Sequence, residues 1–204
     1  TVLVTRPSDQ AADLSNRLHR QGAEVLLQPA IELCESVELA PIRAVMGRLQ
    51  SFDWIVFSSV NGVQAFMHRL LDQYRDLRAL GSVQLAVIGP ATRDALERYF
   101  LQADCLPPRY QAEDLAAELA DRAAGKRFLL VRASRGREVL AEQLTAAGGN
   151  VEQVVFYESR DVLEPLPEIT EALRAGKVNW TTVTSSAIAR SLARIFGDSL
   201  RMTQ

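Results

Sequence analysis

The stretch VLVTRPS, residues 2–8, opens the chain with an apolar run followed by a polar turn. Short runs rich in valine favour a strand, and a serine after such a run favours the start of a helix. The stretch FLLVRAS, residues 128–134, has the same pattern 126 positions later. Each stretch predicts a strand that passes directly into a helix, which is the repeating unit of a parallel sheet covered by helices.

The two stretches belong to a longer internal repeat that aligns without gaps. Identical residues recur at the same offset at strand ends, in helix cores and at helix ends, so two similar strand–helix halves are predicted. The pairs are Leu3 and Leu129, Arg6 and Arg132, Ser8 and Ser134, Leu14 and Leu140, Leu18 and Leu144, Gly22 and Gly148, Val25 and Val151, Glu32 and Glu158, Pro41 and Pro167, Trp54 and Trp180, and Ser59 and Ser185. The first half continues through residues 88–92, whose partner would begin at position 214, so we expect the second half to lack its closing strand–helix units in this sequence.

Alternating strand and helix patterns extend along the whole chain. Strands are predicted over Val2–Thr5, Glu24–Gln28, Trp54–Phe57, Gln84–Ile88, Phe128–Val131, Glu152–Phe156 and Thr181–Val183. Helices are predicted over Asp9–Gln21, Asn61–Leu71, Glu113–Arg122 and Gly136–Ala147. Two further segments, Pro29–Leu39 and Phe156–Pro165, alternate polar and apolar residues and could pair as a two-stranded connector.

Composition excludes several classes of protein. A net charge of −2 argues against general nucleic-acid binding, which needs a strongly basic face. No apolar run reaches the roughly 18 residues of a membrane-spanning helix, and the N-terminus lacks the pattern of a secretory signal. The two cysteines, Cys34 and Cys105, are too few for a disulfide framework or a four-thiolate metal site. We therefore expect a cytoplasmic protein without metal or cofactor, with no nucleic-acid or membrane partner.

Polar residues gather where predicted strands pass into helices. These junctions meet at the carboxyl ends of parallel strands, where ligands bind, and helix N-terminal amides there can hold carboxylates. Each residue could instead be a helix cap, a tight turn or part of a surface ion pair. The candidate binding residues are Arg6, Ser58, Ser59, Gly89, Thr92, Arg132, Ser134, Thr184, Ser185 and Ser186.

Two further arginines, Arg135 and Arg137, are predicted in the first turn of the helix over Gly136–Ala147. Positive charge opposes the helix dipole there, which indicates either a nearby anion or a solvated face. Trp54 and Trp180 begin predicted strands and are interpreted as packing residues.

Six segments, in their order and spacing, resemble the uroporphyrinogen-III synthase family, and the resemblance covers nearly the whole chain. They are Val2–Pro7, Phe52–Ser59, Val87–Thr92, Leu130–Leu140, Val155–Glu158 and Val183–Ser186. The chain departs from the family in two places. Val60 follows the strand-end Ser59 where the family often has proline, and the second half has no partner for the glycine–threonine turn at residues 89–92.

The resemblance implies an α/β fold of two similar parallel-sheet domains, flavodoxin- or Rossmann-like, joined by a two-stranded antiparallel β-ladder. The active site would lie in the cleft between the domains. Connectivity would be discontinuous, with residues 1–35 and 163–204 in one domain and 40–155 in the other. The ladder would be formed by residues of about 29–39 and 156–165.

The resemblance also implies an activity. The family closes hydroxymethylbilane, a linear tetrapyrrole with eight carboxylates, into uroporphyrinogen III for haem and tetrapyrrole biosynthesis. Water is lost, and the last pyrrole ring is inverted through azafulvene and spiro intermediates. Tyr157 matches the family tyrosine that is proposed to help the hydroxyl leave, although it could be only a half-buried connector residue. No cofactor is implied, and we expect a monomer that contacts the preceding enzyme transiently.

One alternative function is a two-lobed small-molecule-binding module without catalysis, and turnover of hydroxymethylbilane would separate the two. A nucleotide-dependent enzyme is not supported. The chain has neither Gly-x-Gly-x-x-Gly after a strand nor a Gly-x-x-x-x-Gly-Lys-Ser/Thr loop.

Overall fold

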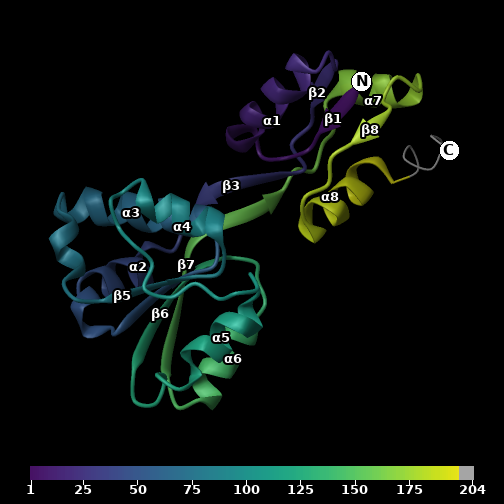
Figure 1. Cartoon of the computed structure of the whole chain (residues 1–204). Coiled ribbons are helices and arrows are strands. Elements are labelled where there is room, and N and C mark those ends of the chain that lie inside the picture. The colour runs from purple at the N-terminus through teal and green to yellow at the C-terminus, as the bar shows by residue number, and fades with distance from the viewer. Residues whose placement is uncertain (198–204) are drawn as a thin grey trace. The chain divides into compact units, whose positions relative to one another are not determined.

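The computed structural model describes residues 1–197, so the last residues of the first expected domain, 198–204, lie outside it. The chain divides into two compact units (Figure 1). Unit 1 contains residues 1–34 and the chain from residue 159 onward, and unit 2 contains Glu35–Glu158. Among residues 1–197, no helix combines the length and apolar character needed to cross a membrane.

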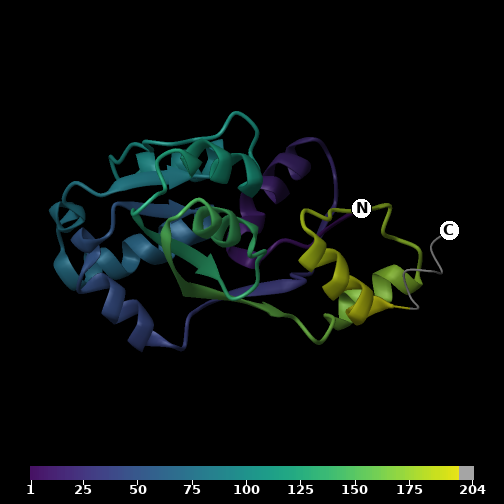
Figure 2. The same cartoon turned by 90° about the horizontal axis from the view of Figure 1, so that it is seen from below.

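Unit 1 is built on a parallel sheet whose strands come from both ends of the chain. Its described strands lie in the order β2-β1-β8, and β1 pairs with both neighbours in parallel. Figures 1 and 2 both show the purple N-terminal strand beside the yellow-green C-terminal segment. The strands are β1 (Val2–Val4), β2 (Val25–Leu27) and β8 (Trp180–Thr181), and the helices are α1 (Ser8–Arg20), α7 (Pro167–Arg174) and α8 (Ser186–Phe196).

The core of unit 1 lies between this sheet and the C-terminal helices. Leu3 of β1 is fully buried and packs with apolar side chains that α7 and α8 present at helical spacing. They are Ile169, Leu173, Ile188, Leu192 and Phe196.

Unit 2 holds most of a sheet with the order β3-β7-β6-β4-β5. The central pairs, β6 with β4, β4 with β5 and β6 with β7, are all parallel. The strands are β3 (Ile31–Glu35), β4 (Trp54–Phe57), β5 (Gln84–Val87), β6 (Arg127–Ala133) and β7 (Asn150–Asp161). The helices are α2 (Leu39–Met46), α3 (Val60–Tyr74), α4 (Pro90–Glu97), α5 (Ala112–Ala120) and α6 (Val139–Ala146), with short 3-10 turns η1 (Leu49–Ser51) and η2 (Leu77–Leu80).

Helices cover both faces of this sheet. Along β4, Ile55 and Phe57 face a core formed with α2, α3 and α4. The alternate residues Trp54 and Val56 face a second core formed with α5 and α6. Figure 1 shows these two groups of helices on opposite sides of the strands. Burial on both faces explains why β4 is a continuous apolar run.

The internal repeat is visible in the fold. The offset of 126 places β1 on β6, β2 on β7 and β8 on β4, and the order β2-β1-β8 matches β7-β6-β4. The helix caps match too. Ser59 caps α3 by accepting from Gly62 N at 3.0 Å, and Ser185 caps α8 by accepting from Ile188 N at 3.2 Å. In unit 2, β5 lies beside β4 and has no counterpart in the described part of unit 1.

The helix-ending glycines of the repeat adopt a left-handed conformation. Gly22 follows α1 with φ +81°, and Gly148 follows α6 with φ +86°. This conformation ends a helix without the steric cost that a Cβ would add.

The predicted strands and helices form with shifted ends. The strand over Trp54–Phe57 is confirmed, whereas β7 is much longer than the predicted segment Glu152–Phe156. The patterns did not predict α2, α7 or the bodies of α4 and α8. The start of the fourth predicted helix is wrong, because α6 begins at Val139 and Arg135 and Arg137 precede it in a loop.

The prediction that both tryptophans pack is correct only for Trp54. Trp54 is 1% exposed, stacks on Phe128 with ring centroids 6.4 Å apart, and lies under the Arg122 guanidinium. Trp180 is 74% exposed. At the offset of 126, the position of Phe128, on which Trp54 stacks, corresponds to Val2 in unit 1. The helix α5, which covers Trp54, has no counterpart among the described helices of unit 1. Within residues 1–197, Trp180 therefore lacks counterparts of the stacked ring and the covering helix that bury Trp54.

The two alternating segments, Pro29–Leu39 and Phe156–Pro165, contribute β3 and the second half of β7, which are neighbours in the sheet. Ser36 N donates to Phe156 O at 3.4 Å, and Val162 N donates to Ala30 O at 3.0 Å.

Candidate active site

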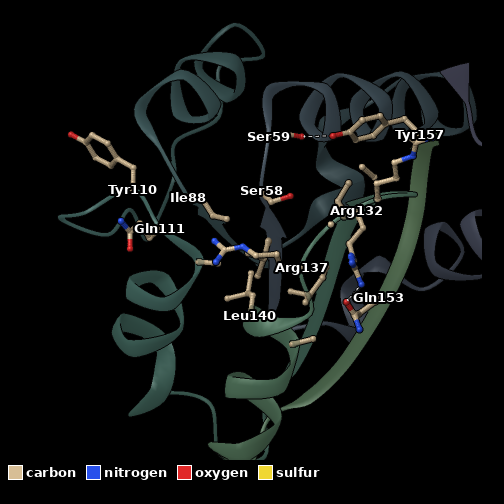
Figure 3. Close-up of a pocket in the computed structure, with 18 residues that line it drawn as sticks. Ser58, Ser59, Ile88, Tyr110, Gln111, Arg132, Arg137, Leu140, Gln153 and Tyr157 are labelled. Atoms are coloured by element: carbon tan, nitrogen blue, oxygen red, sulfur yellow. Dashed lines mark hydrogen bonds between the residues drawn. The ribbon is translucent and has the colours of Figure 1, made fainter. Parts of the chain in front are cut away.

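A cavity of about 360 Å³ lies at the carboxyl ends of the strands of unit 2 (Figure 3). Ser58 and Ser59 follow β4, Ile88 follows β5, Arg132 ends β6, and Tyr157 lies on β7. Apolar side chains of Val56, Leu130 and Leu140 also line it. The parallel topology brings these residues together, because β4, β5 and β6 end at the same edge of the sheet and Tyr157 of β7 pairs there with Ala133.

Tyr157 is hydrogen-bonded at the wall of this cavity. Its phenol oxygen lies 2.9 Å from Ser59 Oγ, the contact drawn as a dashed line in Figure 3. Burial raises the pKa of Tyr157 above its ordinary value of 10.0, against the opposing effect of hydrogen bonds with Ser59 and Asn61. The phenol is therefore protonated at neutral pH and can donate a hydrogen bond.

Arg132 is held in a closed ring of side chains. Its Nη1 donates to Glu138 Oε1 at 2.5 Å and to Gln153 Oε1, and Gln153 Nε2 donates to Glu138 Oε2 at 2.8 Å. Hydrogen bonding from Arg132, and then from Gln153, lowers the pKa of the Glu138 carboxyl and so favours its charged form within the ring. Arg132 thus fixes the loop between β6 and α6, and a ligand carboxylate would have to share its guanidinium with Glu138.

That loop carries Arg135, Gly136 and Arg137 to the cavity. Arg137 forms an ion pair of 2.7 Å with Glu113 at the start of α5 while 67% of its side chain stays exposed. Figure 3 places Arg137 toward Tyr110 and Gln111, with Arg132, Gln153 and Tyr157 on the other side. Arg135 and Arg137 are both exposed, as a solvated face requires, and both line the cavity, where an anion could contact them.

Sequence reasoning missed Tyr110, Gln111, Gln153 and Ile88, which also line the cavity. Tyr110 and Gln111 precede α5 in a loop without a motif, and Gln153 lies inside a strand. The only available signal was that Tyr110, an aromatic residue, precedes the predicted helix Glu113–Arg122, and such a signal is weak.

The structure brings together only part of the candidate binding set. Ser58, Ser59, Arg132 and Tyr157 line the cavity, whereas Gly89, Thr92 and Ser134 do not. Thr92 is 5% exposed within α4. Gly89 caps α4 in an ordinary extended conformation, and a Cβ there would meet Tyr110 Cβ at 3.6 Å, which is normal contact.

Ser134 contributes through its backbone. Its N–H donates to Tyr157 O at 2.9 Å and so ties the end of β6 to β7. The remaining candidates, Arg6, Thr184, Ser185 and Ser186, belong to unit 1 and are not part of this cavity. Among them, Ser185 is the cap of α8.

Comparison with known proteins identifies relatives of the whole chain. The family model described as uroporphyrinogen-III synthase HemD matches residues 12–203. The uroporphyrinogen-III synthase of Synechococcus elongatus is 29% identical over 98% of this chain and 76% of its own length. That of Chlorobaculum parvum is 30% identical over 97% of this chain and 79% of its own.

Solved structures share the fold. A mutant uroporphyrinogen III synthase from Thermus thermophilus superposes with a TM-score of 0.64 at 17% identity, covering 100% of this chain and 89% of that one. The uroporphyrinogen-III synthetase of Helicobacter pylori gives a TM-score of 0.60 at 18% identity, covering 96% and 78%. The α/β fold with parallel sheets is therefore shared with known synthase structures, and with the family match over residues 12–203 it shows that the chain belongs to the uroporphyrinogen-III synthase family.

Proposed function

We propose that this chain closes hydroxymethylbilane to uroporphyrinogen III, with loss of water and inversion of the last pyrrole ring. The observation that carries the proposal is the composition of the cavity in unit 2. It combines a protonated, hydrogen-bonded phenol with three guanidinium groups and an apolar wall. An anionic pyrrole with a hydroxyl leaving group needs these three kinds of partner.

The cavity holds part of the substrate. Small-molecule sites span about 300–1,000 Å³, and 360 Å³ is near the lower end of that range, whereas the substrate has four pyrroles. We assign the cavity to the terminal ring that carries the hydroxymethyl group. Ser58, Arg135 and Arg137 would bind its carboxylates, aided by the backbone amides at the start of α3.

Tyr157 would act as the acid. As the carbon–oxygen bond of the hydroxymethyl group breaks, the electron pair leaves on oxygen and the phenol proton moves to it, forming water. The pyrrole nitrogen lone pair stabilises the carbon left behind as an azafulvene. Attack by the substituted carbon of the last ring on this methylene carbon then gives the spiro intermediate. The original bond of that ring carbon to its neighbouring methylene breaks, and the freed methylene bonds to the unsubstituted carbon of the same ring. The proton lost from that carbon returns to the phenolate as the pyrrole ring regains its aromaticity.

We also propose that the two units are α/β domains of discontinuous sequence, connected by β3 and β7 as an antiparallel ladder. Two observations support this. The hydrogen bonds that flank the segment pair Ser36 with Phe156 and Ala30 with Val162, so residue numbers rise on one strand as they fall on the other. Each unit also has an apolar core of its own. A cytoplasmic location stays a prediction.

An assay with freshly made hydroxymethylbilane, scoring the III and I isomers of the product, tests the activity. We expect the III isomer to exceed the I isomer that forms without enzyme. Tyr157→Phe should lower kcat more than it raises KM, because the hydroxyl acts in the transition state. Tyr74→Phe is the matched control, since Tyr74 donates to Met46 O at 2.7 Å and does not line the cavity.

The two possible failures are distinguishable. Production of the I isomer alone, at the spontaneous rate, would reject the synthase activity and favour the binding module. Formation of the III isomer at an unchanged rate by Tyr157→Phe would reject only the role given to Tyr157.

A further inference from the structure

Ser59 Oγ contacts two functional groups at once. It accepts from Gly62 N at 3.0 Å as the cap of α3, and it lies 2.9 Å from the phenol oxygen of Tyr157. The close approach is fixed by packing. A Cβ on Gly62 would lie 3.3 Å from Ser59 Oγ and 3.5 Å from Val131 Cγ1, so glycine lets the first turn of α3 lie against β6. The cap therefore also places a hydroxyl at a set distance from the phenol.

Either hydroxyl could donate in the Ser59–Tyr157 hydrogen bond, and the cap contact of Ser59 favours Ser59 as the donor. Ser59 has one hydroxyl proton, and its oxygen already accepts from Gly62 N. Accepting one hydrogen bond polarises a hydroxyl and makes it a better donor to the next group. Asn61 also forms a side-chain hydrogen bond with Tyr157, in the sense that favours the phenolate. When Ser59 and Asn61 both donate to the phenol oxygen, the phenol proton is free to point elsewhere.

We propose that Ser59 is a positioning residue for Tyr157: by donating to the phenol oxygen it directs the phenol proton into the cavity. The inference rests on the proposed function and names the group that orients its acid. After proton transfer, the same hydrogen bond holds the phenolate. The bonds made and broken are those of the proposed step: the phenol O–H bond breaks as an O–H bond of the departing water forms. Ser59 keeps its own proton throughout.

A double-mutant cycle on kcat tests whether Ser59 acts through Tyr157. Ser59→Ala should lower kcat about tenfold, a fraction of what a general acid contributes. The double variant Ser59→Ala/Tyr157→Phe should stay within about twofold of Tyr157→Phe alone, because residues that act as one unit are not additive. Ser59→Thr keeps the hydroxyl and should restore most of the rate. Additive losses would show that Ser59 contacts the substrate on its own and would reject the inference.

The phenol pKa gives a readout that a helix cap alone would not move. It can be followed by NMR of protein labelled at the tyrosine Cζ, with the Tyr157 signal assigned from Tyr157→Phe. The two groups that hydrogen-bond the phenol, Ser59 at the cap of α3 and Asn61 in its first turn, are neutral. The charged side chains that line the cavity are Arg132, Arg135 and Arg137. Ser59→Ala changes none of these charges. The Tyr157 pKa should therefore rise in Ser59→Ala and stay unchanged in Ser185→Ala, which removes the repeat-related cap of α8.

Two further outcomes are decisive. If loss of the cap prevents Ser59→Ala from folding, the test uses Ser59→Asp in its place. Aspartate caps a helix about as effectively as serine does, but its carboxylate has no proton to donate at neutral pH. Ser59→Asp with the wild-type kcat, or a Tyr157 pKa that does not move in Ser59→Ala, overturns the inference. An unchanged kcat in Tyr157→Phe would overturn the acid role in the proposed function and this inference together, whereas additivity overturns the inference alone.

Discussion

Replacing the two repeat-related tryptophans tests the packing of the two units. Trp54→Ala removes a side chain that is 1% exposed, stacked on Phe128 and covered by Arg122. A buried tryptophan hides about 200 Å² of surface, and truncating one to alanine costs about 3–5 kcal/mol. Trp180 is 74% exposed, so Trp180→Ala removes only about a quarter of that contact and should cost about 1 kcal/mol or less.

The measurement is urea unfolding of both variants, followed by far-ultraviolet circular dichroism for the whole chain and by tryptophan emission for one unit at a time. The chain has two tryptophans, and each variant retains the other one, whose emission reports its own unit. Trp54→Ala should lower the midpoint of unit 2 while the emission of Trp180 unfolds as in the wild type. A midpoint shift in Trp180→Ala as large as that in Trp54→Ala would refute the exposed position of Trp180 and the asymmetry between the units.

Three further predictions concern the cavity, the repeat and pH. Arg137→Ala should lower kcat/KM about tenfold, the scale of one lost charge-assisted hydrogen bond; Glu113→Ala, which breaks the same ion pair but keeps the guanidinium, should stay near the wild-type value. Gly148→Ala should lower stability in thermal melting by about 1–2 kcal/mol, because φ is +86° and the new Cβ would meet Ala124 Cα at 3.4 Å; an unchanged Tm would argue against the left-handed turn. The pKa of Asp53 is held below its ordinary value of 3.8, first by the hydrogen bond from Arg127 N and then by that from Lys126. The contribution of Asp53 to stability is therefore present above pH 3.8 and lost as pH falls through the lowered pKa. In denaturation at graded pH, Asp53→Asn should weaken this loss of stability at acidic pH, and an unchanged loss would exclude Asp53 as its cause.

The sequence by itself determined the features that depend on near neighbours. The offset between VLVTRPS and FLLVRAS predicted β1 and β6 as equivalent strands, and the structure places them in equivalent sheet positions. Ser59 and Ser185 were recognisable as caps, and Gly22 and Gly148 as helix ends. Strand alternation, capping and a left-handed turn each depend on a few consecutive residues, so a local pattern is sufficient to indicate them.

Tertiary structure decided which of these residues share a site. Ser59 and Tyr157 are 98 positions apart, and Arg132 and Gln153 are 21 apart, so their contacts arise only when β4, β6 and β7 align. Trp54 and Trp180 are identical in the repeat yet differ in burial, because burial depends on which distant helix covers the sheet. Arg132, a candidate for binding substrate, lines the cavity and also donates to Glu138, a contact that the sequence did not indicate. A side chain's partners are set by the packing of elements far apart in the chain, and a single sequence contains no local signal of that packing.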